Sequence, residues 1–104
     1  MLYDIQQKFQ KKAYEYSKHA VDQMIHRNIR VREIEEAIFR HAEVVEKYPE
    51  DKYGPSCLIL GFTSSGRPLH ILCSYPSRPL LKIITTYEPD PDCWVEHKIR
   101  KPNG

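Results

Sequence analysis

The chain has 104 residues, which is enough for one domain built around one hydrophobic core. Hydrophobic residues make up 40% of it and charged residues 29%, proportions that exclude a disordered protein. The formal net charge of +2 is too small for nucleic-acid binding by bulk electrostatics, so such binding would require a local basic patch.

The sequence predicts a cytoplasmic protein that has no membrane segment and no cofactor. No apolar run reaches the roughly 18 residues that span a bilayer, and the N-terminus lacks the features of a secretory signal. Cys57, Cys73 and Cys93 form no CxxC pair, so we expect reduced thiols rather than a metal site. The four glycines form no phosphate-binding loop.

Helical periodicity dominates the first part of the chain. Apolar residues at helical spacing predict an amphipathic helix over residues 2–14. Ser17 is expected to be the N-cap of a second helix that runs to about Asn28. A third helix is predicted to start at Val31, without a small polar cap. The expected buried stripe of the second helix consists of Ala20, Val21, Met24 and Ile25.

After His41 the pattern changes from helical to extended. Strands are predicted over residues 43–48, 57–62, 69–73 and 80–87, and the segments between them are rich in Pro, Gly, Ser and Asp. Short connections favour antiparallel pairing of these strands. The sequence therefore predicts a single α+β domain over residues 1–104, with two or three N-terminal helices packed on a four-stranded antiparallel sheet. Residues 94–101 give only a weak signal for a helical turn or a strand.

His70 is notable because it lies in the middle of an apolar strand. A buried imidazole must either be hydrogen-bonded to a neighbour in the core or face a functional site, and both interpretations stay open. If the preceding loop holds four residues, His70 pairs near Thr85 of the next strand. Leu81, Ile83, Thr85 and Tyr87 would then share its face, although a shift of one residue reverses that assignment.

An imidazole beside a hydroxyl, a phenol and cations is suited to phosphodiester cleavage. The reaction needs a base for the ribose 2′-OH, an acid for the leaving oxygen and positive charge near the phosphate. The candidate cations are Arg27, Arg78 and Lys82. On the second helix, His19 and His26 are two turns apart, about 10 Å along the axis, and so cannot bind one metal ion together. Exposed histidines on a polar helix face usually have no role.

Several short motifs together resemble a prokaryotic domain-of-unknown-function family that is related to the RelE-like toxins and, more distantly, to the BrnT and MqsR ribonuclease toxins. The resemblance spans roughly residues 17 to 95. The motifs are Ser17-Lys18-His19-Ala20, Met24, Arg27-Asn28-Ile29, Glu33-Ile34, Ala37-Ile38, Tyr48-Pro49, Leu58-Ile59-Leu60-Gly61, Pro68-Leu69-His70, Ile84-Thr85-Thr86-Tyr87, Pro89-Asp90 and Trp94.

The resemblance implies a RelE-like fold and metal-independent mRNA cleavage. It also implies a partner antitoxin that silences the enzyme, and in relatives this partner often carries a small zinc-finger domain or a helix-turn-helix. The family motif positions present in this chain are His19, Arg27, His70, Thr85 and Tyr87.

The leading hypothesis is therefore a toxin-like endoribonuclease. His70 would act as general acid or base, His19 would complement it, and Tyr87 would position the phosphate or donate a proton. Arg27 would bind phosphate. Two alternatives stay open: a non-catalytic module of the same fold that binds a partner protein encoded nearby, and a structural domain that dimerises through an open sheet edge.

Overall fold

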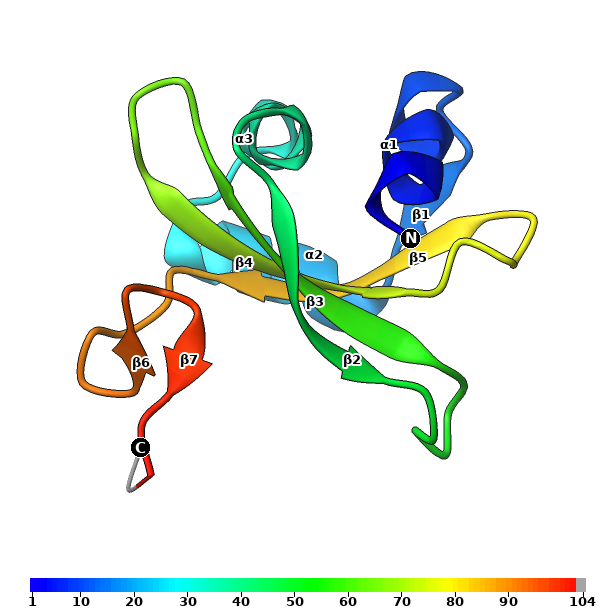
Figure 1. Cartoon of the computed structure of the whole chain (residues 1–104). Helices are drawn as coiled ribbons and strands as arrows, with labels where there is room; N and C mark the ends of the chain where they lie inside the picture. The colour runs from blue at the N-terminus through cyan, green and yellow to red at the C-terminus, as the bar shows by residue number, and fades with distance from the viewer. Residues whose placement is uncertain (103–104) are drawn as a thin grey trace.

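The computed structural model describes residues 1–102 and shows a mixed α+β domain (Figure 1). Its elements in chain order are α1 (Leu2–Gln10), β1 (Tyr14–Tyr16), α2 (Lys18–Arg27), α3 (Val31–Phe39), β2 (Glu43–Tyr48), β3 (Ser56–Phe62), β4 (Pro68–Ser74), β5 (Leu81–Tyr87), β6 (Trp94–Val95) and β7 (Ile99–Arg100). No helix in this part of the chain has both the length and the hydropathy needed to cross a membrane.

The main sheet has five strands in the order β1-β5-β4-β3-β2. Strands β2 to β5 form the predicted antiparallel meander. The prediction of a purely antiparallel four-stranded sheet is wrong in one respect, because β1 adds to the edge of β5 in parallel and makes the sheet mixed. The first helix ends at Gln10 rather than near residue 14, and Lys12 adopts a left-handed φ of 56° that turns the chain into β1.

The two faces of the sheet have different covers. In Figure 1, α1 and α3 lie above the sheet and the small β6–β7 hairpin lies below it. Facing the helices is an apolar core whose sheet residues are Cys57, Ile59, Leu69, Ile71, Cys73, Leu81 and Ile83. At Gly61, α3 approaches so closely that an added Cβ would lie 2.0 Å from the carbonyl oxygen of Ala37. A side chain of any size at position 61 would force the helix away from the sheet.

The second helix packs against β5 with only half of its apolar stripe. Its predicted N-cap is confirmed, since the Ser17 hydroxyl accepts a hydrogen bond of 3.0 Å from the Ala20 amide. Within the stripe, Ala20 and Met24 are buried, whereas Val21 is 42% exposed and Ile25 is 76% exposed. The prediction that the whole stripe is buried is therefore wrong for its outer half.

The third helix begins at Val31 as predicted, although no small polar residue caps it. The carboxylate of Glu33 instead accepts a hydrogen bond of 3.0 Å from the backbone N–H of Arg30, which satisfies one of the free donors at this end. On the sheet side, Ile34, Ala37 and Ile38 are fully buried. The helix ends before His41, which is exposed and has a left-handed φ of 49°.

Candidate functional site

His70 is fully buried on the sheet face opposite α1 and α3, and both of its ring nitrogens have hydrogen-bond partners. Nε2 lies 2.6 Å from the backbone oxygen of His97, and Nδ1 lies 3.2 Å from the hydroxyl of Tyr87. A carbonyl oxygen can only accept, so Nε2 carries the proton and Nδ1 accepts from the Tyr87 hydroxyl. Burial lowers the pKa of His70, which favours the neutral ring that this pattern requires.

The register around His70 differs from the predicted one. His70 pairs with Tyr87, and Leu72 pairs with Thr85. A bulge follows between Leu72 and Cys73, so Cys73 pairs with Ile83. Thr85 and Tyr87 share the face of His70 as expected, because they pair with Leu72 and His70. The extra residue reverses the alternation beyond Thr85. Leu81 and Ile83 therefore do not share this face: they point into the core under the helices.

Tyr87 connects the buried histidine to the surface. Its side chain is half-buried and lines two hollows. One has a volume of about 440 Å³ and is also lined by Arg27, Arg67 and Glu88. The other, of about 320 Å³, is lined as well by Tyr48, Asp51, Ser56, Leu58, Leu72 and Arg100. Burial raises the pKa of Tyr87, with Arg100 the largest effect in the opposite direction, so the phenol keeps its proton at neutral pH.

The C-terminal hairpin covers His70 and supplies one of its hydrogen-bond partners. The Trp94 ring packs edge-on against the His70 ring, with centroids 4.5 Å apart. Arg100 stacks over Trp94 at 4.7 Å and forms an ion pair of 3.0 Å with Glu46. His97 has a φ of 65°, a conformation that non-glycine residues rarely adopt. The residue with this φ is the one whose carbonyl oxygen accepts the hydrogen bond from the His70 ring.

Arg27 lies at the last turn of α2, beside the tyrosine. Its guanidinium is 5.8 Å from the centre of the Tyr87 ring, and Nη1 donates to the Thr86 carbonyl at 2.9 Å. The remaining N–H groups of Arg27 have no hydrogen-bond partner within residues 1–102. Arg67, by contrast, is held by Glu33 and Glu88. Arg67 thus fixes the hairpin loop, while Arg27 has donors available for an anion.

His19 is on the first turn of the same helix and does not join this group. It is exposed, and no hydrogen bond links it to His70 or Tyr87 within the described chain. Arg27 is eight residues further along α2, a distance of about 12 Å along the helix axis. The helix therefore brings Arg27 to the tyrosine and leaves His19 apart from the site.

The other three predicted residues lie along β5 and the loop before it. Thr85 is half-buried opposite Leu72 on the face of His70. Lys82 and Arg78 line a hollow of about 330 Å³ at the far end of the strand. The structure thus brings His70, Tyr87 and Arg27 together, and places the two remaining cations at the other end of β5.

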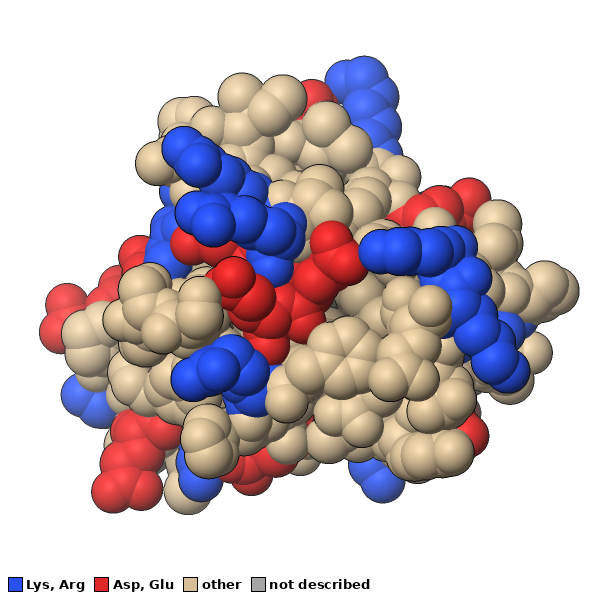
Figure 2. Space-filling view, turned by 90° about the horizontal axis from the view of Figure 1, so that it is seen from above, with Lys and Arg blue, Asp and Glu red and all other residues tan. Residues whose placement is uncertain are grey.

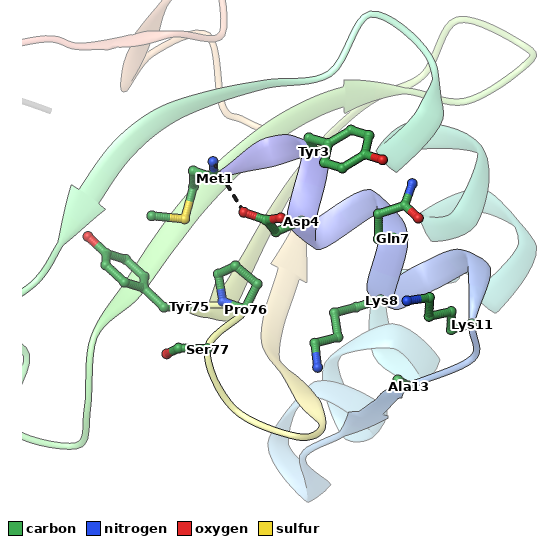
Figure 3. Close-up of a pocket in the computed structure, with 10 residues that line it drawn as sticks. All are labelled: Met1, Tyr3, Asp4, Gln7, Lys8, Lys11, Ala13, Tyr75, Pro76 and Ser77. Carbon is green, nitrogen blue, oxygen red and sulfur yellow. Dashed lines mark ion pairs between the residues drawn. The ribbon is translucent and has the colours of Figure 1, made fainter.

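The face covered by α1 and α3, and a larger hollow beside α1, contain none of the predicted site residues that surround His70. Figure 2 views the molecule from the side of α1 and α3 and shows acidic side chains between two groups of basic ones. The larger hollow, of about 650 Å³, lies between α1 and the loop after β4 (Figure 3). There the Lys8 ammonium donates to the Pro79 carbonyl at 3.0 Å, and Asp4 is paired with the terminal amine. None of the predicted site residues lines this hollow.

Sequence reasoning missed several residues around the candidate site. The carbonyl of His97 is a backbone group with no side-chain signature, and Arg100 and Glu46 meet across 54 residues. The hydroxyl of Tyr48 donates to Glu46 beside them. Trp94, the only tryptophan of the chain, was the one available signal in the tail.

Comparison with known proteins gives a family but no activity. No curated protein and no solved structure matches the chain. A family model described as Domain of unknown function (DUF4258) matches residues 16–88, which include His70, Tyr87 and every predicted site residue. Helix α1 and the β6–β7 hairpin lie outside the matched range. Because the match covers well over half of its length, the chain belongs to the DUF4258 family.

Proposed function

We propose that this protein is a toxin-like, metal-independent endoribonuclease that cleaves mRNA at the Tyr87–His70 pair. The observation that carries the proposal is the hydrogen bond between the half-exposed phenol and the buried, neutral imidazole, with Arg27 beside it. The sequence resemblance to RelE-like toxins supports the same activity. It also suggests a cognate antitoxin as partner, with a zinc-finger or helix-turn-helix domain.

In the proposed reaction, Tyr87 and His70 act as a proton relay. The ribose 2′-OH gives its proton to the Tyr87 oxygen while the Tyr87 proton moves to Nδ1 of His70. The 2′-oxygen forms a bond to phosphorus, the bond from phosphorus to the 5′-oxygen breaks, and the leaving oxygen takes a proton from a water molecule. The hydroxide that remains takes the proton back from His70 through Tyr87, which restores the neutral pair. The positive imidazolium is stabilised by the His97 carbonyl, which already accepts from Nε2.

Cations would stabilise the charge that develops on the phosphate. The free N–H groups of Arg27 suit this role because a guanidinium can bind two phosphate oxygens at once. Arg100 lines the neighbouring hollow, but its charge is shared with Glu46. Arg27 is therefore the proposed phosphate-binding residue, and His19 has no part in the mechanism.

The test compares single-stranded RNA cleavage, with EDTA present, by the wild type and by Tyr87→Phe. This variant keeps the ring and removes only the hydroxyl, so cleavage should fall at least about 100-fold, which is the usual contribution of a positioned acid or base. Tyr3→Phe, at an exposed position on α1, is the matched control and should cleave normally. The products should end in a 2′,3′-cyclic phosphate. Unchanged cleavage by Tyr87→Phe would remove the relay mechanism.

The same variants should behave consistently in cells. Expression of the wild type in a bacterial host should arrest growth and degrade mRNA, and His70→Ala or Tyr87→Phe should abolish both effects. Normal growth with intact mRNA under wild-type expression would argue against a toxin nuclease.

One observation favours a second function, the binding of a partner protein. Val21, Ile25 and Val31 are 42%, 76% and 43% exposed, and they line an apolar groove between α2 and α3. If the domain is a non-catalytic binding module, the product of a neighbouring gene should co-purify with it. Ile25→Glu should abolish that complex, whereas Ile99→Glu, at a residue that is 65% exposed on the C-terminal hairpin, should retain it.

A further inference from the structure

A second polar hollow lies at the opposite end of β5 from the Tyr87–His70 pair. It has a volume of about 330 Å³ and is formed by the loop after β2, the loop after β4 and the start of β5. Its polar and aromatic lining residues include Asp51, Tyr53, Ser74, Tyr75, Arg78 and Lys82. The combination of cations and aromatic rings is typical of single-stranded nucleic-acid sites.

The cations of this hollow are available to a ligand. Arg78 is exposed and Lys82 is half-buried, and no ion pair joins either of them to a carboxylate within residues 1–102. Arg67 and Arg100, by contrast, both form ion pairs with glutamates. Neither cation is therefore held in an ion pair at this end of the sheet, although the Asp51 carboxylate lines the same hollow.

The aromatic ring of Tyr53 is exposed while its backbone is held. The side chain is 83% exposed, and the Lys52 ammonium lies 5.0 Å from the ring centre. Asp51 holds the loop: one carboxylate oxygen accepts from the Tyr53 N–H at 3.1 Å, and the other accepts from the Ser56 hydroxyl at 3.3 Å. The loop thus presents a flat apolar surface on a fixed backbone.

The two hollows lie on one face of the molecule and meet at Asp51, which lines both of them. Ser56, the hydrogen-bond partner of Asp51, also lines the Tyr87 hollow. From Lys82 to Tyr87, β5 covers about 17 Å at roughly 3.3 Å per residue. A chain of a few nucleotides can therefore reach from one hollow to the other.

We propose that the hollow at Arg78 and Lys82 is a subsite for one nucleotide of single-stranded RNA, next to the nucleotides at the cleavage site. Its base stacks on Tyr53, and its phosphate binds Arg78 and Lys82. A paired base cannot expose its face for stacking, so the substrate class is single-stranded RNA rather than a duplex. The inference rests on the proposed ribonuclease function, since it assigns a further part of the same substrate to the same face.

The experiment measures binding and cleavage separately. Binding is followed by fluorescence anisotropy with a labelled single-stranded 2′-O-methyl RNA, which lacks the nucleophile and is not cleaved, and cleavage is followed with unmodified RNA of the same sequence. The variants are Arg78→Ala/Lys82→Ala and Tyr53→Ala. The matched control is Lys11→Ala/Arg32→Ala, which removes the same charge at two exposed positions. Lys11 directly follows α1, and Arg32 lies on α3.

We expect Arg78→Ala/Lys82→Ala to weaken binding at least about tenfold relative to the control double variant. It should also lower the salt dependence of the affinity, by about 0.7 in slope for each lost phosphate contact. Tyr53→Ala should weaken binding about fivefold or more, as expected for the loss of one stacked base. Equal affinities for Arg78→Ala/Lys82→Ala and the control would overturn the subsite.

The two proposals fail in different ways. If the wild type cleaves RNA but Arg78→Ala/Lys82→Ala binds like the control, the subsite is wrong and the nuclease function stands. If the wild type binds RNA through this hollow without cleaving it, the subsite is supported and the nuclease function is wrong. If the wild type neither binds nor cleaves RNA, both proposals are wrong.

Discussion

The two faces of the sheet use alternate residues of the same strands for different purposes. On β3 and β4, the residues that face the helices are Cys57, Ile59, Gly61, Leu69, Ile71 and Cys73. Their neighbours on the other face include His70, whose ring carries two hydrogen bonds in a fully buried position. The helix face is sealed by α1 and α3, and the other face is covered only in part, by a hairpin of two-residue strands.

The difference shows where stability and chemistry are separated in this fold. The helix face gains its energy mainly from the close packing of apolar side chains. The other face holds a polar pair that costs free energy to bury unless every hydrogen bond is made. Substitutions on the helix face should therefore change stability most, whereas those at the Tyr87–His70 pair should change activity more than stability.

Gly61→Ala should have the largest effect on stability. The new methyl group would lie 2.0 Å from the Ala37 carbonyl oxygen, so α3 must move away from β3. We expect a loss of about 3 kcal/mol in the free energy of unfolding, measured by urea denaturation. Gly54→Ala is the comparison: its Cβ meets no atom within 4 Å, and only its φ of +106° is strained, so about 1 kcal/mol should be lost. Equal losses would mean that α3 accommodates the contact freely.

His70→Phe should have the second largest effect, because it keeps an aromatic ring, of somewhat larger size, and removes both polar nitrogens. The Tyr87 hydroxyl and the His97 carbonyl would lose their partner beneath the hairpin. We expect a loss of about 2 kcal/mol in the same denaturation measurement, typical of buried polar groups left without partners. A variant as stable as the wild type would mean that water replaces the imidazole, and that this face is more open than its burial suggests.

Much of the fold was predictable because it is encoded locally. Apolar runs separated by turn residues indicated the meander, and Ser17 before an apolar stripe indicated a helix start. The added strand β1 was missed because three residues give no periodicity and their partner Leu81 lies 67 residues further along the chain. The bulge between Leu72 and Cys73 has no sequence signature either. It shifts the partner of His70 by one residue, and a turn one residue longer than expected shifts it by another, so His70 pairs with Tyr87 rather than Thr85.

The candidate site was predictable in its side chains but not in its arrangement. A histidine within an apolar strand requires a partner, and a tyrosine at the end of the next strand was in reach once the strands were placed. His19 and Arg27 lie on the same helix, but sequence spacing alone did not show which end of that helix is close to His70 and Tyr87. The covering hairpin was missed because its contacts to His70 run through a backbone carbonyl and a distant indole.

Thr86→Val tests a hydrogen bond that links a residue on the helix side of β5 to the backbone of His70. Thr86 is fully buried opposite Ile71, on the helix side, and its hydroxyl donates to the His70 carbonyl at 2.8 Å. Valine keeps the shape and removes this bond, so we expect a loss of about 1 kcal/mol in the free energy of unfolding. Thr85→Val, at the half-buried neighbour on the other face, should change stability less. The reverse order would place the tighter packing on the face of His70.

The smallest effect we expect is a dependence of stability on pH that comes from the His70 face. Burial lowers the pKa of His70 below the ordinary value of 6.5, so the unfolded chain binds this proton more readily than the folded one. The free energy of unfolding should therefore hold steady above pH 6.5 and decrease as the pH falls through and below 6.5. His70→Phe should remove part of that decrease, whereas His26→Gln, at an exposed position, should leave it unchanged. The same decrease in all three proteins would assign the acid sensitivity to carboxylates, and would mean that the imidazole is protonated as easily in the folded state as in the unfolded chain.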